Sequence, residues 1–230
     1  MPGEGREPIT KFKNYYKGED IYVLGSGASM EFINPNFFKN KLSIGANGVW
    51  KYFPVSFSVF KHKHFVKEAS DAGKVCIASL HDCGDIGKPI NEDPLADYVF
   101  THKKGRFEDL EANFQENLDA VGKDDDIFVS YSTITSCIHL AAYMGADNII
   151  ICGHDCGYID GESHVKDYAD HIHEYHKEAF DSYHKMWFER ISSDSERLKA
   201  KLKEVYGCEV YSLNPFINFK LEGHTYVTKK

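Results

Sequence analysis

Short apolar runs separated by polar or amphipathic stretches recur along most of the chain. Apolar runs of about four to eight residues bounded by turn residues are typical of strands buried in a parallel sheet. Strands are predicted at residues 20–25, 41–45, 55–60, 74–78, 98–101, 127–129, 148–152 and 208–213. Because helical patterns or loops separate these strands, we expect an α/β fold with a Rossmann-like, doubly wound, mostly parallel sheet.

Helical periodicity predicts the segments that connect these strands. The predicted helices cover residues 62–69, 106–118, 134–144 and 182–206. Residues 1–18 are expected to be a loose arm, and residues 81–95, rich in Gly, Pro and Asp, a surface loop. We expect one domain over residues 1–230, on which the histidine-rich segment 156–183 forms a small helical lid.

The most apolar part of the chain is a helix followed by a strand, between residues 130 and 158. Nearly every position of the helix at 134–144 is apolar or small, so we expect it to be buried on most of its surface. Ser132 and Thr133 stand at its start, where a helix leaves its first backbone N–H groups unpaired. A helix start that also carries hydroxyl groups can hold a phosphate.

Glycines and polar residues follow three of the predicted strands. They are Gly25, Ser26 and Gly27, then Asn47, and finally His154 and Asp155. Open α/β sheets bind ligands at the carboxyl ends of their strands, so we expect these residues to share one site. Glycines let the backbone approach a ligand, and an amide can donate to a phosphate or a ribose. The alternatives are a tight strand–helix turn capped by Ser29, and a common Asn-Gly turn at Asn47.

Charge and composition limit the partners of the chain. The net charge is −8 without a long basic run, which argues against nucleic acid as the main partner. The basic cluster at residues 61–64 is expected to be solvated surface. No apolar stretch reaches the roughly 18–20 residues of a membrane span, and the N-terminus lacks the apolar core of a signal peptide. We expect a cytoplasmic protein. A peripheral membrane contact and a homo-oligomer are left open.

The six cysteines show no paired CxxC spacing. Cys137, Cys152 and Cys208 lie in or beside apolar runs and are expected to be small buried thiols. This pattern favours a reduced protein.

Six histidines lie between residues 154 and 184, after the strand at 148–152. They are His154, His164, His171, His173, His176 and His184. A histidine suits proton transfer because its pKa lies near neutral pH. The alternative is a metal site, since His173 and His176 are three residues apart with Glu174 between them. Without an HExxH or paired-cysteine signature we expect no metal, and we interpret the acidic residues 124–126 as a solvated turn.

Four blocks of the sequence together resemble a known group of enzymes. They are IYVLGSGAS, SIGANGVW, STITSCIHLAAYMGADNIIICGHDCGY and VYSLNP. The pattern is similar to that of the small bacterial sialyltransferases that use CMP-sialic acid. It is equally similar to the related domain of 6-hydroxymethylpterin diphosphokinases and motility-associated-factor glycosyltransferases. In the sialyltransferases a Rossmann-like sheet binds the CMP moiety and a small lid folds over the sugar.

The resemblance implies roles for residues near the strand ends. It implies nucleotide contact for Asn47 and donor contact for Ser132 and Thr133. Asp155 matches the acidic residue that closes the strand. The first glycine turn carries an Asn in that family, whereas this chain has Ser26.

The resemblance also implies where the reaction is catalysed. The catalytic histidine of the family lies in the lid. Counting back from the VYSLNP block reaches Arg190, and His184 is the nearest preceding histidine. Tyr158 is the near counterpart of the tyrosines that assist the leaving phosphate. The candidate catalytic residues are therefore His184, Asp155, His154 and Tyr158.

These features favour a nucleotide-dependent transferase, a sialyltransferase-like enzyme that moves a CMP-activated sugar to a sugar or glycan acceptor. This reaction needs no cofactor. One alternative is a pyrophosphokinase for a pterin-like alcohol, in which Mg²⁺ comes with ATP and is held by a carboxylate such as Asp155. The other is a nucleotide-binding module without catalysis.

Overall fold

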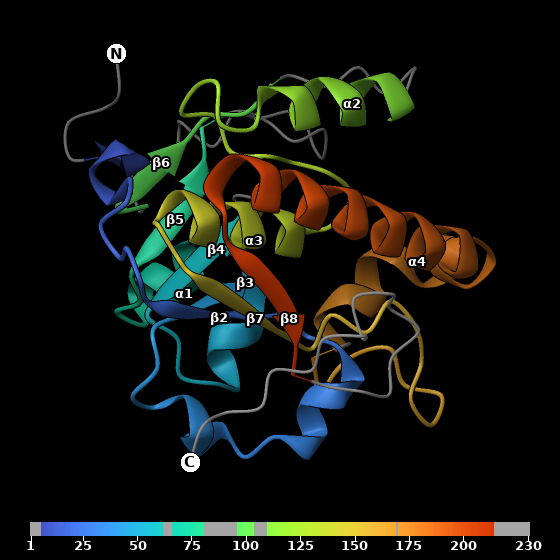
Figure 1. Cartoon of the computed structure of the whole chain (residues 1–230). Coiled ribbons are helices and arrows are strands. Elements are labelled where there is room, and N and C mark those ends of the chain that lie inside the picture. Colours follow the sequence, from blue (N-terminus) through green and yellow to red (C-terminus); the bar gives the residue numbers. More distant parts are fainter. Residues whose placement is uncertain (1–5, 62–65, 81–95, 104–109, 169, 214–230) are drawn as a thin grey trace.

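The structure is a computed structural model that describes residues 6–61, 66–80, 96–103, 110–168 and 170–213 (Figure 1). For residue 110 and for residues 170–187 it describes the backbone alone. The strands are β1 (Glu7–Pro8), β2 (Asp20–Leu24), β3 (Ser43–Ala46), β4 (Phe57–Phe60), β5 (Cys76–Ser79), β6 (Tyr98–Phe100), β7 (Asn148–Cys152) and β8 (Glu209–Ser212).

Within the described residues the strands form one eight-stranded sheet in the order β1-β6-β5-β4-β3-β2-β7-β8. Every pair of neighbouring strands is parallel. The predicted α/β class with a doubly wound parallel sheet is therefore confirmed.

Helices cover both faces of the sheet (Figure 1). The α-helices are α1 (Val66–Asp71), α2 (Leu110–Ala120), α3 (Thr133–Tyr143) and α4 (Asp170–Tyr206), and the 3-10 helices are η1 (Ile9–Phe12), η2 (Ala28–Phe32), η3 (Pro35–Phe38) and η4 (Asn47–Lys51). Helix α3 ends before Gly145, whose φ of +96° suits glycine. Helix α4 ends at Tyr206 as predicted but begins at Asp170, inside the segment expected to be a lid.

Alternating side chains of the central strands enter two separate cores. Ile21 and Val23 of β2 pack on the face covered by α3 and α4. Tyr22 and Leu24 pack on the opposite face, with side chains of η2, η3 and η4. Because both faces of the sheet are covered, most residues of the central strands are apolar. This is why the strands can be predicted from continuous apolar runs in the sequence.

The direction of the chain through the sheet reverses at β2. From β2 the chain proceeds through β3, β4, β5 and β6 toward one edge, whereas β7 lies on the other side of β2 and leads to β8. In open α/β sheets, ligands bind at the carboxyl ends of the two strands that such a switch point separates, and here these strands are β2 and β7. The predicted site residues Gly25 to Gly27 and Gly153 to Asp155 follow these two strands directly.

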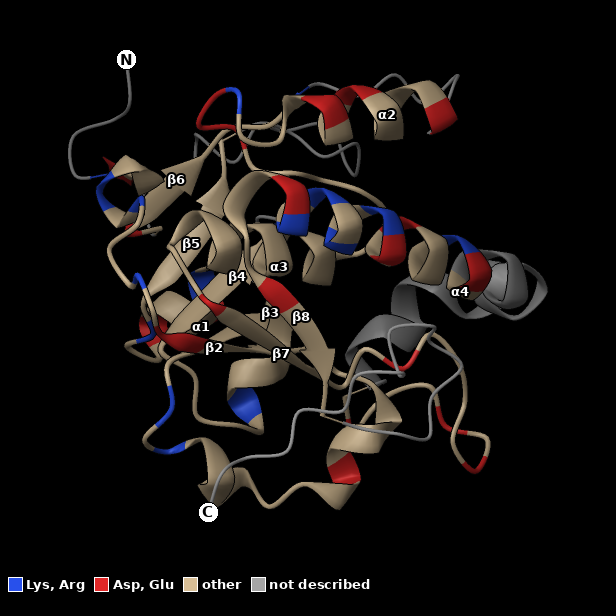
Figure 2. Cartoon of the chain, in the orientation of Figure 1, with Lys and Arg blue, Asp and Glu red and all other residues tan. Residues whose placement is uncertain are grey.

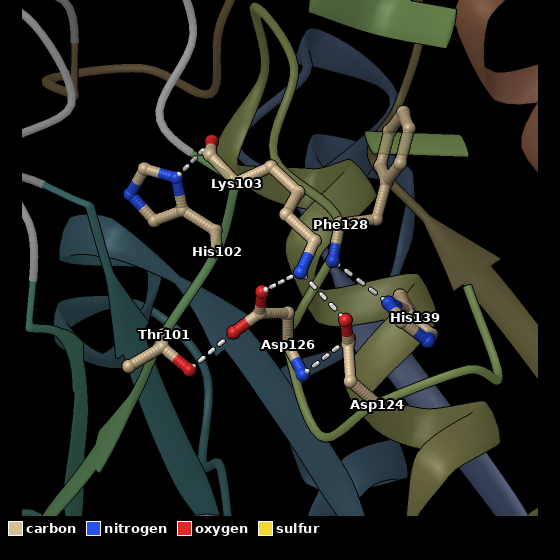
Figure 3. A network of polar contacts seen from close by, with 7 residues as sticks. All are labelled: Thr101, His102, Lys103, Asp124, Asp126, Phe128 and His139. Carbon is tan, nitrogen blue, oxygen red and sulfur yellow. Dashed lines mark hydrogen bonds and ion pairs between the residues drawn. The ribbon is translucent and has the colours of Figure 1, made fainter. Parts of the chain in front are cut away.

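The prediction of a strand at residues 127–129 is wrong. The Ile127 N–H donates to the carbonyl of Thr101 at 2.7 Å. The Phe128 N–H donates to Nδ1 of His139, in α3, at 2.8 Å (Figure 3). Because a side chain takes up the Phe128 amide, the segment does not continue into a sheet ladder.

The acidic turn beside this segment is held by Lys103 (Figure 3). Nζ of Lys103 lies 2.6 Å from Oδ2 of Asp124 and 2.8 Å from Oδ2 of Asp126, and the Thr101 hydroxyl donates to Asp126. Asp124 and Asp125 are exposed, so the interpretation of these residues as a surface turn agrees with the structure.

The N-terminal arm is not loose over its described part. Residues 7 and 8 form β1 beside β6, and Ile9 and Phe12 are buried. The Phe12 ring meets the edges of Phe57 and Tyr98 at centroid distances of 5.3 and 4.7 Å. Aromatic packing on the sheet thus orders a segment whose local sequence shows no strong pattern.

Lys61 is buried, which contradicts the expectation of a solvated basic cluster at residues 61–64. Its side chain follows β4 and is 6% exposed. Residues 62–64 lie outside the described part of the chain. Cys137, Cys152 and Cys208 are buried free thiols, as predicted.

Candidate functional site

The turn after β2 is fastened to the loop after β7. The Gly25 N–H donates to the carbonyl of Cys152 and the Gly27 N–H to that of Gly153, each at 2.8 Å. Asp155 accepts from the backbone N–H of Ser29 at 2.7 Å and from the Ser29 hydroxyl. Ser29 therefore binds Asp155 and does not cap the helix, in contrast to the alternative interpretation of this turn; the N-cap residue of η2 is Gly27.

The two glycines of this turn leave no space for a larger residue. A Cβ at Gly27 would lie 2.5 Å from Cγ of Asp155 and 2.7 Å from the carbonyl oxygen of Gly153. A Cβ at Gly25 would overlap the same carbonyl and lie 3.2 Å from Cδ1 of Ile134. Glycine is needed here because two backbone segments approach each other closely.

Burial raises the pKa of the Asp155 carboxyl, and the two hydrogen bonds from Ser29 oppose this rise. Asp155 is 3% exposed. The carboxyl group thus lies under the turn, where it fixes the position of residues 25–29.

The start of α3 lies beside the same turn, because Ile134 is in its first turn and lies next to Gly25. Ser132 is the N-cap residue, and its hydroxyl accepts from the Ile134 N–H at 3.3 Å. Thr133 is buried as the first residue of the helix. The predicted capping hydroxyls are therefore brought to the glycine turn, together with the partial positive charge of a helix N-terminus.

Asn47 begins η4 at the end of β3, the strand next to β2. Its backbone is left-handed, with φ of +52°, and its buried Oδ1 has no hydrogen-bond partner among the described residues. A left-handed residue other than glycine is uncommon, and an unpaired buried oxygen is costly. Both features set Asn47 apart as a ligand-binding candidate.

Tyr168 joins the Asn47 turn to the glycine turn. Its phenol oxygen accepts from the Ser26 hydroxyl and from the Gly48 backbone N–H, and burial raises the pKa of the phenol. The Val165 N–H donates to the carbonyl of Ser26 at 2.7 Å. Two residues of the expected lid segment, Val165 and Tyr168, therefore contact the predicted nucleotide-binding turns directly.

His154 is buried behind this edge, with 7% exposure. Its Nε2 lies 2.9 Å from the hydroxyl of Ser195 in α4, and that hydroxyl donates to the carbonyl of Ile191 at 2.9 Å. Burial lowers the pKa of His154 to about 3. The ring is therefore neutral near pH 7 and connects the β7 loop to α4.

No protein-family model matches the sequence, and no curated protein matches it. Solved structures do match. The monofunctional α-2,3-sialyltransferase Cst-I from Campylobacter jejuni is 15% identical, with a TM-score of 0.54 over 92% of this chain and 81% of its own. The sialyltransferase CstII from the same organism, in complex with the substrate analogue CMP-3FNeuAc, is 12% identical, with a TM-score of 0.54 over 92% and 86%. A Cst-II variant in complex with CMP is 12% identical, with a TM-score of 0.55 over 92% and 86%.

The chain has the fold of these sialyltransferases. The sequence resemblance thus leads to the right fold, although the identity is low. In this sialyltransferase fold the residues predicted to bind the nucleotide gather at one sheet edge: Gly25, Ser26, Gly27, Asn47, Ser132 and Thr133.

The remaining candidate catalytic residues lie farther along the chain. Tyr158 is 47% exposed, and its ring meets that of Phe188, in α4, at a centroid distance of 5.4 Å. His184 belongs to α4 one turn before Phe188, and its side chain is outside the described part of the structure. The structure therefore does not test their catalytic roles.

Arg190, the residue reached by counting back from the VYSLNP block, is part of an ion-pair cluster. Its guanidinium lies 2.8 Å from Glu111 of α2 and 2.9 Å from Asp194 of α4. Arg197 pairs with Glu111 at 2.7 Å, so that acidic α2 faces basic residues of α4 (Figure 2). Asp194 is fully buried, and this burial raises the pKa of its carboxyl to about 6.

Sequence reasoning missed three residues of this region: Tyr168, Lys61 and Ser195. Tyr168 and Ser195 act through partners more than 40 positions away, and no local pattern marks them. A signal did exist for Lys61, because it directly follows a predicted strand, as Asn47 does.

In the described part of the chain no three His, Cys, Asp or Glu side chains are grouped to hold a metal ion. Residues 171–176, where the metal alternative lies, have no described side chains. None of the described helices combines the length and the apolar character needed to span a membrane.

Proposed function

We propose that this protein is a nucleotide-dependent glycosyltransferase that transfers a CMP-activated acidic sugar to a sugar or glycan acceptor. One observation carries the proposal. The glycine turn, the N-terminus of α3 and the loop ending in Asp155 meet at the switch point between β2 and β7. The fold supports it, because two solved structures of the Cst-II sialyltransferase, which has the same fold, are complexes with CMP and with CMP-3FNeuAc.

In this proposal the sheet edge binds the donor. The backbone of Gly25 to Gly27 lies against the nucleotide, and the Asn47 amide binds its ribose or base. Ser132 and Thr133, with the N–H groups of α3, bind the phosphate. Asp155 holds the glycine turn in place through Ser29.

The reaction breaks the bond between the sugar and the phosphate of CMP, so negative charge grows on the leaving phosphate. Preorganised donors are most effective against such charge, and the start of α3 supplies them without a metal ion. Tyr158 is proposed to assist the same phosphate. His184 is proposed as the base for the acceptor hydroxyl, because His154, with a pKa of about 3, is a weak base.

The first experiment compares the thermal stabilisation of the protein by CMP, CDP, ATP and GTP, each with and without Mg²⁺. Cytidine nucleotides are expected to raise the melting temperature most, with no requirement for Mg²⁺. Equal effects of all four nucleotides would contradict the proposal. A dominant effect of ATP with Mg²⁺ would favour a pyrophosphokinase instead.

The second experiment measures release of CMP from CMP-sialic acid with and without sugar acceptors. His184→Gln is expected to lower turnover while leaving the affinity for CMP unchanged, because a base acts only in the chemical step. Lys67→Gln, which changes an exposed lysine of α1, is the control. Equal turnover of the His184 variant and the control would remove His184 from the mechanism. Binding of CMP without turnover by the native protein would indicate a binding module.

A further inference from the structure

Lys61 is a buried cation at the edge of the sheet where the proposed donor site lies. It follows the last residue of β4, as Asn47 follows the last residue of β3, and these two strands are neighbours. Phe57 and Val59 of β4 pack in the core on the α3 face. Because side chains alternate along a strand, the Lys61 side chain continues on that face.

The ammonium group of Lys61 lies at the entrance to α3. It donates to the carbonyl oxygens of Ser130 at 2.7 Å and Tyr131 at 3.3 Å. These residues come immediately before the N-cap Ser132. The Lys61 charge also acts on Cys137, in the second turn of α3. Burial raises the pKa of the Cys137 thiol, and the positive charge of Lys61 opposes this rise.

A cation in this place has an electrostatic consequence beyond its two hydrogen bonds. A helix N-terminus carries a partial positive charge, and Lys61 adds a full charge beside it. Burying an ammonium group is costly, and a neutral amide could donate to the same two carbonyls. An anion bound at the start of α3 would interact favourably with both positive groups.

A second feature of the same helix indicates a ligand. The Ser136 side chain, at the first turn of α3, is fully buried, and its hydroxyl has no hydrogen-bond partner among the described residues. Side chains of a helix tilt toward its N-terminus, which is the end next to Lys61. Nearly all buried hydroxyl groups in proteins form a hydrogen bond, so the unpaired Ser136 hydroxyl is consistent with a hydrogen bond to a bound ligand.

We propose that Lys61 determines specificity for the anionic part of the donor: together with the N-terminus of α3 it binds the phosphate group of the nucleotide. This inference rests on the proposed function in placing a nucleotide at this edge. It goes beyond that function by assigning the recognition of phosphate to the residue that follows β4, outside the four sequence blocks. Lys61 thereby distinguishes a nucleoside monophosphate from the uncharged nucleoside.

The test compares CMP, cytidine and inorganic phosphate as ligands of the full chain, by calorimetry and by thermal shift. The variants are Lys61→Met, Lys61→Gln and Lys61→Arg. Gln keeps a donor for the Ser130 and Tyr131 carbonyls without the charge, and Arg keeps the charge. The matched control is Lys67→Gln, because Lys67 is an exposed lysine of α1 that pairs with Asp71. Native circular dichroism spectra confirm that each variant is folded.

Loss of the charge is expected to weaken CMP binding about 10- to 100-fold, the effect of one charge-assisted hydrogen bond. Cytidine binding is expected to be unchanged in Lys61→Gln, and Lys61→Arg and the control should bind CMP like the native protein. If Lys61→Gln weakens CMP and cytidine equally, Lys61 only supports the fold and the inference is overturned. Should Lys61→Met fail to fold, the Gln variant decides.

Inorganic phosphate separates this inference from the proposed function. If phosphate stabilises the native protein but not Lys61→Gln, while CMP gives no more stabilisation than GTP, the anion site is supported and the proposed function fails. If phosphate does not stabilise the native protein and CMP binds no better than cytidine, the Lys61 inference fails. This holds whether or not the protein prefers cytidine nucleotides to ATP and GTP.

Discussion

Asp155 and Ser29, 126 positions apart in the sequence, form a paired contact in which one carboxylate binds both the backbone N–H and the hydroxyl of the same serine. This contact closes the switch point between β2 and β7. It also explains the position of the acidic residue: the buried N–H group of Ser29 needs an acceptor, and the loop after β7 supplies one.

Asp155→Asn should destabilise the protein by about 1–3 kcal/mol, because the two donors of Ser29 bind different carboxylate oxygens and Asn replaces one of these with an NH2 group that cannot accept. Ser29→Ala should cost less in the Asp155→Asn background than in the native protein. Urea unfolding of both single variants and the double variant measures this coupling. Additive effects of the two substitutions would show that the contact contributes nothing of its own.

Gly27→Ala should lower both stability and CMP affinity, since its Cβ would lie 2.5 Å from Cγ of the fixed Asp155 side chain. Overpacking of this kind costs about 1–3 kcal/mol. Gly48→Ala is the comparison, because its Cβ would lie 3.3 Å from the Tyr168 ring, a contact that a shift of a few tenths of an ångström would relieve. Unfolding and calorimetry should rank Gly27→Ala as the more damaging change, and the reverse order would contradict the described packing.

Tyr168→Phe should weaken CMP binding and reduce stability by about 1–2 kcal/mol, because Ser26 and the Gly48 N–H both lose their acceptor. Tyr15→Phe is the control, since Tyr15 is 70% exposed. Calorimetric titration with CMP measures the affinity. Unchanged binding in Tyr168→Phe would mean that the two turns keep their relative position without this hydroxyl.

His139→Gln should make the protein less sensitive to acid. The Phe128 N–H donates to Nδ1 of His139, so Nε2 carries the proton and faces the Tyr206 hydroxyl at 3.1 Å. Burial lowers the pKa of His139 to about 3, whereas an unfolded histidine has a pKa of about 6.5. Between these values the unfolded state binds the extra proton, so stability is present above about pH 6.5 and is lost as the pH falls.

A glutamine can accept from Phe128 and donate to Tyr206 without titrating. Over pH 4 to 6 the slope of unfolding free energy against pH should therefore fall by up to about 1.4 kcal/mol per pH unit relative to the native protein. Urea unfolding at several pH values measures the two slopes. Identical slopes would indicate that His139 is not the neutral, buried group described.

Local sequence patterns predicted the parts of the site that depend on neighbouring residues. The apolar runs of β2, β3 and β7 mark strands buried on both faces, and Ser132 marks a helix start through its capping hydroxyl. The glycines at positions 25 and 27 mark a close approach of backbone, without showing to what. Each of these features follows from interactions within a few residues along the chain.

The prediction at residues 127–129 shows where local patterns fail. The run Ile-Phe-Val is as apolar as a strand, but the Phe128 amide binds the His139 side chain instead of a neighbouring strand. A basic cluster at residues 61–64 similarly suggests surface, although Lys61 is buried. In both cases the deciding partner lies on another element.

The sequence by itself determined the class of fold, the strand ends that carry polar residues, and the helix start that can bind an anion. Only the tertiary structure decided that Asp155 holds Ser29, that Tyr168 joins Ser26 to Gly48, and that Lys61 stands at the entrance to α3. The physical reason is that backbone periodicity and capping are short-range effects. The partner of a buried polar group is set instead by the order of strands in the sheet, which brings together residues far apart in the chain.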